Sequence, residues 1–195
     1  MSVLLDPIYA FVFLGLFSPG PNVILLTASG ARFGFQRTLP HLAGVVLGVG
    51  IIAGLTAFGL GAILIAMPQL TLALKGIAAV WILWMAWRLW SSEARLSDAS
   101  DAPMTFTQAV LFQWLNPKIW AVALSGITLY PGGFSPIGEA ARLASAFSGI
   151  NLGVCIFWTA AGTLLTFLLT SPAAWRIFMR VMALALVAFS IMLFV

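Results

Sequence analysis

Prolines and polar side chains interrupt two otherwise apolar runs of the chain. Residues 17–22 read FSPGPN, and residues 113–120 read QWLNPKIW. Each proline removes a backbone donor and clashes with the preceding turn, while glycine adds conformational freedom, so an unbroken helix through Pro19 and Pro21 is not expected. We therefore predict that one helix stops and another starts at each interruption.

The helix ends at these interruptions have the chemistry to bind a small dipolar solute. Helices that begin near Asn22 and Asn116 present unpaired N–H groups and a partial positive charge, which suit a carboxylate. The helices before them end in carbonyls that, with amide side chains, suit an ammonium group. The alternative is that the prolines merely kink the helices. The candidate binding residues are Ser18, Pro19, Gly20, Pro21, Asn22, Gln113, Asn116, Pro117, Lys118 and Asn151.

Lys118 is the charged residue that follows the second interruption. At roughly 1.5 Å per residue it lies about 16 Å into its apolar run. A lysine at that depth costs on the order of 3 kcal/mol on insertion scales, so we expect it to face a cavity and attract a substrate carboxylate. The alternative is that its ammonium group snorkels to the headgroups. For Asn151, a cavity position and an interhelical hydrogen bond are both open.

Acidic residues are expected only in loops or at the ends of the apolar runs, at Asp6, Glu93, Asp98, Asp101 and Glu139. A buried cationic side chain of a substrate would then have no counter-ion, which favours neutral substrates. The remaining titratable candidate is His41, whose ordinary pKa lies near neutrality. It is the candidate residue for proton coupling, the alternative being an interfacial histidine without a role.

Catalytic and metal-binding patterns are missing from the sequence. It has no pair of buried aspartates and no His-x-x-x-Glu site, and its one histidine has no evident serine partner. The single cysteine, Cys155, lies in an apolar run and is expected to be a packing residue. We therefore predict no catalytic residue, no metal site, no cofactor and no enzyme activity.

The composition indicates the kind of fold that must position these residues. The chain has 195 residues, of which 62% are hydrophobic and 7% charged, and its mean hydropathy is +1.10. This profile predicts an integral membrane protein, and the scattered basic residues behind the net charge of +4 form no nucleic-acid surface. Since roughly 20 apolar residues cross a bilayer, we predict an all-α membrane protein that forms a single transmembrane domain over residues 1–195. Its six transmembrane helices are expected near residues 7–29, 40–66, 70–90, 107–130, 145–170 and 174–195.

Lysine and arginine are distributed unevenly over the predicted connections. The odd-numbered connections and their flanks hold six of them, Arg32, Arg37, Arg88, Arg95, Arg176 and Arg180, whereas the even-numbered ones hold only Lys75 and Arg142. The positive-inside rule then places the odd connections in the cytoplasm and both chain ends outside. The alternative is a re-entrant first segment, which would move the N-terminus to the cytoplasmic side.

The two interruptions occupy equivalent places in the two halves of the chain. Each breaks the first helix of a group of three, and the groups must run oppositely through the membrane because three spans separate their starts. This pattern predicts two inverted three-helix repeats, about 1–90 and about 107–195, joined by a cytoplasmic linker over 91–106. Discontinuous helices in such repeats point to a transport site near the bilayer midplane, with either a cavity or dense packing around the breaks.

Several motifs occur in an order and spacing that resemble the lysine exporter (LysE/RhtB) family. They are SPGPN, then GARFGFQRTLPHLAGVVLG, then LKGIAAVWILWMAWRLW, then FQWLNPKIWAVAL, and they cover nearly the whole chain. Trp81 stands where many relatives have tyrosine, and the linker is short with balanced charge. The resemblance implies a six-helix exporter of amino acids or close derivatives in the inner (plasma) membrane, driven by the proton gradient.

The expected function is therefore secondary export of neutral amino acids or close derivatives from the cytoplasm. The expected partners are a small amino acid, protons and membrane lipid, and homo-oligomerisation is left open. A passive channel or a non-transporting membrane scaffold is the alternative, since inverted broken helices also permit either. The sequence leaves the identity of the solute undetermined.

Overall fold

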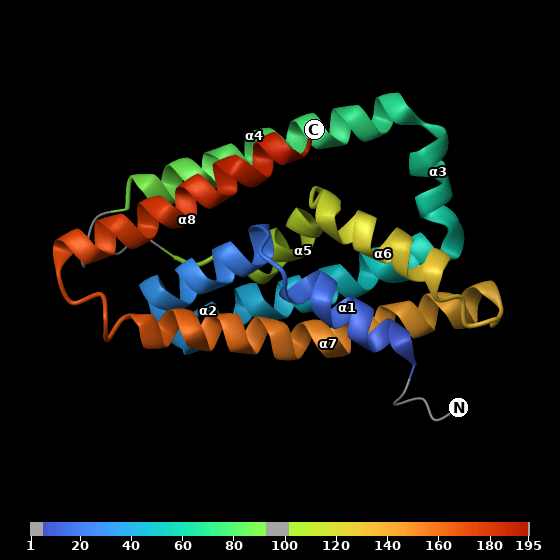
Figure 1. The fold of residues 1–195 in the computed structure, drawn as a ribbon, viewed down its shortest axis with the longest axis horizontal. Coiled ribbons are helices and arrows are strands. Elements are labelled where there is room, and N and C mark those ends of the chain that lie inside the picture. The colour runs from blue at the N-terminus through green and yellow to red at the C-terminus, as the bar shows by residue number, and fades with distance from the viewer. Residues whose placement is uncertain (1–5, 93–101, 195) are drawn as a thin grey trace.

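The computed structural model describes residues 6–92 and 102–194, which fold into helices without strands. Most of the predicted linker, with Glu93, Arg95, Asp98 and Asp101, lies outside the described residues. The chain folds back on itself repeatedly (Figure 1). In chain order the elements are α1 Pro7–Phe17, α2 Pro21–Leu55, the π-helix η2 Thr56–Leu60, α3 Gly61–Ala66, α4 Pro68–Trp90, α5 Phe106–Trp114, α6 Pro117–Leu129, α7 Pro136–Leu165 and α8 Pro172–Met192.

Side-chain caps start the helices α1, α5, α7 and α8. Asp6, Ser135 and Ser171 each accept a backbone N–H from the first turn of α1, α7 and α8, and a proline stands at the start of each of these helices. Thr105 forms a reciprocal capping box with Gln108 at the start of α5. By contrast, no side chain of the described residues caps α4, or α2 and α6, the helices that start at the two interruptions.

The helix α2 consists of two parts that run in opposite directions. Gly34 separates them with φ 77° and ψ 170°, a conformation that suits glycine because it has no Cβ. Across this turn, the hydroxyl of Ser29 before it and the hydroxyl of Thr38 after it lie 3.0 Å apart. The chain therefore reverses at Gly34, between the first two predicted spans, although the predicted gap between them is largely helical.

Contacts with α7 confirm this reversal. The part before Gly34 reaches the C-terminal half of α7, where the Thr163 hydroxyl donates to the Gly30 carbonyl at 3.2 Å. The part after it returns to the N-terminal half, where the Ser148 hydroxyl donates to the Val46 carbonyl at 3.3 Å. The 7–33 and 35–60 segments thus form a hairpin along α7.

Four helical stretches are long and apolar enough to cross a membrane. They are Pro21–Leu60, Pro68–Trp90, Pro136–Leu165 and Pro172–Met192. The helices α1 and α6 are apolar but shorter. Both predicted interruptions are present, because α1 ends at Phe17 before α2 begins at Pro21, and α5 ends at Trp114 before α6 begins at Pro117.

The start of α7 corrects one sequence prediction. The fifth helix was expected from about residue 145, but it begins at Pro136. Glu139, expected in a loop, therefore lies in the first turn of a helix and is only 8% exposed. The prediction failed because Ser135 and Pro136 form a helix start whose first turns carry the charged residues Glu139 and Arg142, and these lowered the apparent hydropathy.

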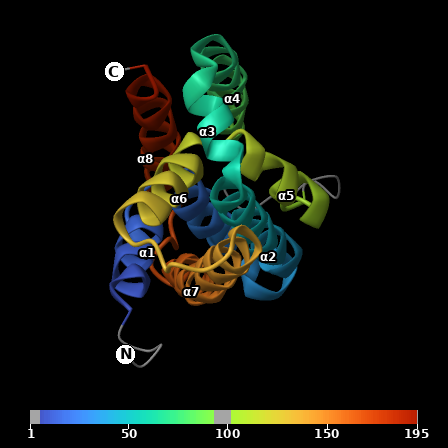
Figure 2. The ribbon, with the colours of Figure 1, turned by 90° about the vertical axis from the view of Figure 1, so that its right-hand side faces the viewer.

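The helices pack in two layers joined by α5 and α6. Seen from the end, α4 and α8 lie together on one side and α1, α7 and α2 on the other (Figure 2). One buried cluster fills the α1, α2 and α7 side, around residues such as Val49 and Phe147, and a second lies under α4 and α8, around Ile82 and Met179.

Both parts of α2 make their longest contact with α7, and small residues allow the helices to come close together. A Cβ placed on Gly162 would lie 2.1 Å from the Thr27 carbonyl oxygen, and one on Gly30 would lie 2.3 Å from the Thr159 carbonyl oxygen. Real Cβ atoms do not approach backbone this closely, so the helices would have to separate. This is the close approach that small residues permit between membrane helices.

Replacing Gly162 by alanine should therefore lower the free energy of unfolding by about 1–3 kcal/mol, as overpacking does. The matched control is Gly149→Ala on the same helix, where an added Cβ meets nothing within 4 Å. Heating the protein in detergent with a thiol-reactive dye measures the effect, because the single cysteine, Cys155, is buried and reacts only on unfolding. Equal midpoints for the two variants would contradict the close α2–α7 contact.

Candidate functional site

The two interruptions meet through a pair of amide side chains. Asn22, in the first turn of α2, donates its Nδ2 to Gln113 Oε1 at 2.8 Å, and Gln113 Nε2 donates back to Asn22 Oδ1 at 3.1 Å. Gln113 lies near the end of α5 and has no exposed surface. Two reciprocal hydrogen bonds thus join the start of α2, just after the first interruption, to the end of α5, just before the second.

Gln113 has every hydrogen-bonding site of its amide in use. Its Nε2 also donates to the Ala109 carbonyl at 3.0 Å, and its Oε1 accepts a long contact of 3.5 Å from Asn116 Nδ2. An amide side chain offers two donors and two acceptor lone pairs, so none is left for a ligand. Gln113 therefore orients Asn22 and Asn116 in this conformation.

Lys118 reaches from the first turn of α6 to the end of α1. Its ammonium group donates to the Ser18 carbonyl and to the Pro19 carbonyl, the latter at 3.3 Å. The Ser18 hydroxyl caps its own turn by donating to the Gly15 carbonyl at 2.9 Å. The carbonyls expected to hold a ligand's ammonium group are therefore held here by the chain's own lysine, and the ammonium group does not snorkel away from the break.

A small cavity of about 10 Å³ lies where these groups meet. Of the predicted residues, Gly20, Asn22, Asn116, Lys118 and Asn151 line it. Ser18 and Pro19 do not line it, although their carbonyls accept from Lys118. This space corresponds to about one water molecule and is too small for an amino acid. Of the two sequence alternatives, cavity or dense packing, the cluster of amides and lysine is densely packed, while a separate cavity adjoins the second break.

Buried polar atoms at the cavity have hydrogen-bonding capacity to spare. Among the described residues, Asn116 Oδ1, Asn151 Nδ2 and Trp158 Nε1 have no hydrogen-bond partner, and their atoms are inaccessible to solvent. Buried polar groups are normally paired, so such atoms mark a place where a polar guest would gain hydrogen bonds. Together they offer one acceptor and two donors.

Trp158 and Cys155 are cavity residues that the sequence analysis did not select. Both lie on the same face of α7 as Asn151, because positions four and seven residues further along a helix return to that face. This spacing was the available signal. It was missed because an aromatic residue and a cysteine in an apolar run read as ordinary packing residues.

His41 lies apart from the break. It is 2% exposed, whereas the sequence placed it at an interface, and it lines a separate cavity with Arg32 and Arg88. A third and larger cavity, of about 530 Å³, lies between α4 and the α5–α6 break and is lined mainly by apolar side chains. Pro117 borders this larger cavity, so α6 begins between the two spaces.

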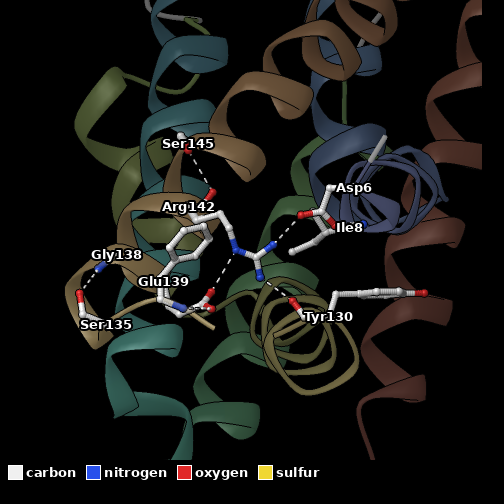
Figure 3. A network of polar contacts seen from close by, with 9 residues as sticks. Asp6, Ile8, Tyr130, Ser135, Gly138, Glu139, Arg142 and Ser145 are labelled. Carbon is white, nitrogen blue, oxygen red and sulfur yellow. Dashed lines mark hydrogen bonds and ion pairs between the residues drawn. The ribbon is translucent and has the colours of Figure 1, made fainter. Parts of the chain in front are cut away.

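A network of charges ties together the ends of α1, α6 and α7 (Figure 3). The Arg142 guanidinium contacts Asp6 Oδ2 at 2.9 Å and Glu139 Oε2 at 3.0 Å, and it also donates to the Tyr130 carbonyl. Glu139 in turn accepts the Phe134 N–H at 3.3 Å. This network joins residues that are 136 positions apart, which no sequence pattern indicated.

A double-mutant cycle tests the amide pair. Asn22→Leu and Gln113→Leu should each lower the free energy of unfolding because the remaining amide is left unpaired. The double variant should cost less than the sum, with a coupling of about 0.6–1.7 kcal/mol. Denaturant unfolding in micelles measures each value, and Asn22→Leu with Ser171→Ala at the distant α8 cap is the additive control. Strict additivity for Asn22 and Gln113 would exclude the pairing.

Comparison with known proteins identifies the family. The chain is 28% identical over 128 residues to a cysteine/O-acetylserine efflux protein of Salmonella typhimurium, and 27% identical over 128 residues to such proteins of Salmonella typhi and Shigella flexneri. Each of these matches covers 66% of this chain and 66% of the relative. No solved structure matches. The LysE type translocator profile matches residues 13–195. The chain therefore belongs to the LysE type translocator family and is a multi-pass membrane transporter rather than an enzyme.

Proposed function

We propose that the protein is a secondary exporter of neutral amino acids or close derivatives, moving them out of the cytoplasm across the inner membrane. The relatives are named for the efflux of cysteine and O-acetylserine, both of which carry one carboxylate and one ammonium group at neutral pH. The observation that carries the proposal is the meeting of two broken helices at a buried cluster of amides and one lysine. That cluster can satisfy both charges of such a solute.

Six transmembrane spans arranged as two inverted repeats fit this role. The segment through the first break and the segment through the second run in opposite directions (Figure 1). The breaks touch each other, as expected when discontinuous helices of two repeats form one site. In this arrangement the arginine-rich end near Gly34 faces the cytoplasm, and the Asp6–Glu139–Arg142 network closes the outer end.

Substrate binding in this proposal begins with an exchange at the end of α1. The substrate ammonium group replaces Lys118 at the Ser18 and Pro19 carbonyls, and the released Lys118 pairs with the substrate carboxylate. One charge is thereby exchanged for another at the same carbonyls, so no buried charge is left unpaired. The cavity of about 10 Å³ must widen for this step, so the conformation described is an occluded one.

Selectivity for neutral substrates follows from the position of the acidic side chains. Among the described residues, Asp6 and Glu139 both contact Arg142 at the outer end, and neither lines the cavity at the break. A substrate with a second cationic group would find Lys118 there and no carboxylate. Coupling to the proton gradient remains part of the proposal, with His41 as its candidate residue.

Lys118→Met should reduce export strongly, raising the half-saturating substrate concentration at least about tenfold because a hydrogen-bonded charge is lost. Lys75→Met is the matched control, since Lys75 is the other lysine of the chain and lines the large apolar cavity instead. The measurement is initial-rate transport of radiolabelled O-acetylserine in proteoliposomes. Unchanged affinity in Lys118→Met would refute the exchange.

Accumulation experiments distinguish an exporter from a passive channel or an inert scaffold. Expression should lower the intracellular level, and relieve the toxicity, of cysteine, O-acetylserine, homoserine or threonine, with little effect on lysine. In proteoliposomes an imposed pH difference should drive the substrate above its equilibrium concentration. Flux that follows only the concentration difference would indicate a channel, and the absence of flux would indicate a scaffold.

A further inference from the structure

A second cavity, of about 90 Å³, lies between the two parts of α2, α4 and the start of α5, and apolar side chains make up most of its lining. Its polar lining residues are Ser29, Arg32, His41, Trp81, Arg88 and Gln108. By the measure that makes the cavity at the break equal to about one water molecule, this volume holds several, which is enough for the charged end of an amino acid. The site at the break does not include any of these residues.

Trp81 and His41 line this cavity, and each has buried polar atoms without a partner. Trp81 Nε1 and both ring nitrogens of His41 are buried and have no hydrogen-bond partner among the described residues. An indole N–H can only donate, and a neutral imidazole always carries one donor. Leaving such donors unpaired in a buried place is costly, so the pattern indicates a ligand that accepts hydrogen bonds.

The other polar groups at the cavity are also mostly donors. Gln108 uses its Oε1 to accept the Thr105 N–H at 3.0 Å, so its NH₂ group is the part that can face a ligand. Arg32 and Arg88 also line the cavity, and their guanidinium groups lie over the rings of Phe33 and Trp84 at 5.3 Å and 5.2 Å. No acidic side chain of the described residues lines the cavity. The unpaired donors of Trp81 and His41 therefore match a ligand that accepts hydrogen bonds, such as a carboxylate.

We propose that this cavity is a loading site that binds the substrate's carboxylate on the cytoplasmic side before it reaches the break. The inference rests on the proposed function and adds a second binding step to it. Ser29 lies seven residues after Asn22 on the first part of α2, a rise of about 10 Å along the helix. The two cavities thus lie about 10 Å apart along α2 and on different faces of it.

Binding of acetate tests the loading site without requiring transport. Saturation-transfer NMR on the purified protein in micelles should detect acetate, which has a carboxylate and no ammonium group, and should not detect acetamide. Trp81→Phe and His41→Leu should each weaken acetate binding about tenfold or more. Trp87→Phe, at an exposed position of the same helix, is the matched control and should bind as the unmodified protein does.

His41→Gln separates binding from proton coupling. Glutamine keeps a donor but does not titrate, so this variant should retain acetate binding, whereas His41→Leu should lose it. In inside-out vesicles, Trp81→Phe should raise the half-saturating concentration of O-acetylserine and leave the maximal rate nearly unchanged. Loss of the pH-driven gradient in His41→Gln with normal acetate binding would identify the coupling role and leave the loading site intact.

The results that overturn the loading site differ from those that overturn the proposed function. If acetate fails to bind, or binds equally to the unmodified protein, Trp81→Phe and His41→Leu, the loading site is wrong even when export depends on Lys118. If no amino acid is exported but acetate binding depends on Trp81 and His41, the proposed function is wrong and the cavity remains an anion site.

Discussion

The reciprocal hydrogen bonds between Asn22 and Gln113 are the contact on which this architecture depends. A helix that stops inside an apolar environment leaves backbone groups unpaired, and this cost is tolerable only when protein groups surround the break. Here each break is placed against the other, so a single buried cluster serves both. The prolines that create the breaks and the amides that join them therefore form one structural unit.

Lys118 complements the partial charge of the helix end at the first break. Carbonyls at the end of α1 carry a partial negative charge, and the ammonium group that faces them comes from the start of the other broken helix. An ion held by neutral dipoles is bound less tightly than one paired with a carboxylate, so it can be exchanged for another ammonium group. Among the described residues no acidic side chain lines the cavity at the break, and this is as important as the presence of the lysine.

The sequence predicted the breaks well because proline and glycine act locally, and their effects are visible in six or eight letters. It also identified Asn22, Asn116, Lys118 and Asn151, which the structure brings together at one small cavity. The exact turn at Gly34 was not predicted, because a positive φ leaves no signature beyond the glycine itself. The ion network of Asp6, Glu139 and Arg142 depends on contacts between distant segments, which hydropathy cannot detect. For the same reason the unpaired Trp81 and His41 nitrogens appear only once burial is known.

The glycine contacts between α2 and α7 determine which parts of the molecule are free to move. With Gly30 and Gly162 pressed against opposing backbone, the hairpin of α2 and the α7 helix behave as one stiff frame, since sliding either helix would create collisions within a fraction of an ångström. Helix α5 belongs to this frame as well, since a Cβ on Gly44 would lie 2.3 Å from the Phe106 carbonyl oxygen. In the proposed transport cycle, alternating access would then be a movement of the α4–α8 pair against this frame, with the Asn22–Gln113 contact kept in place.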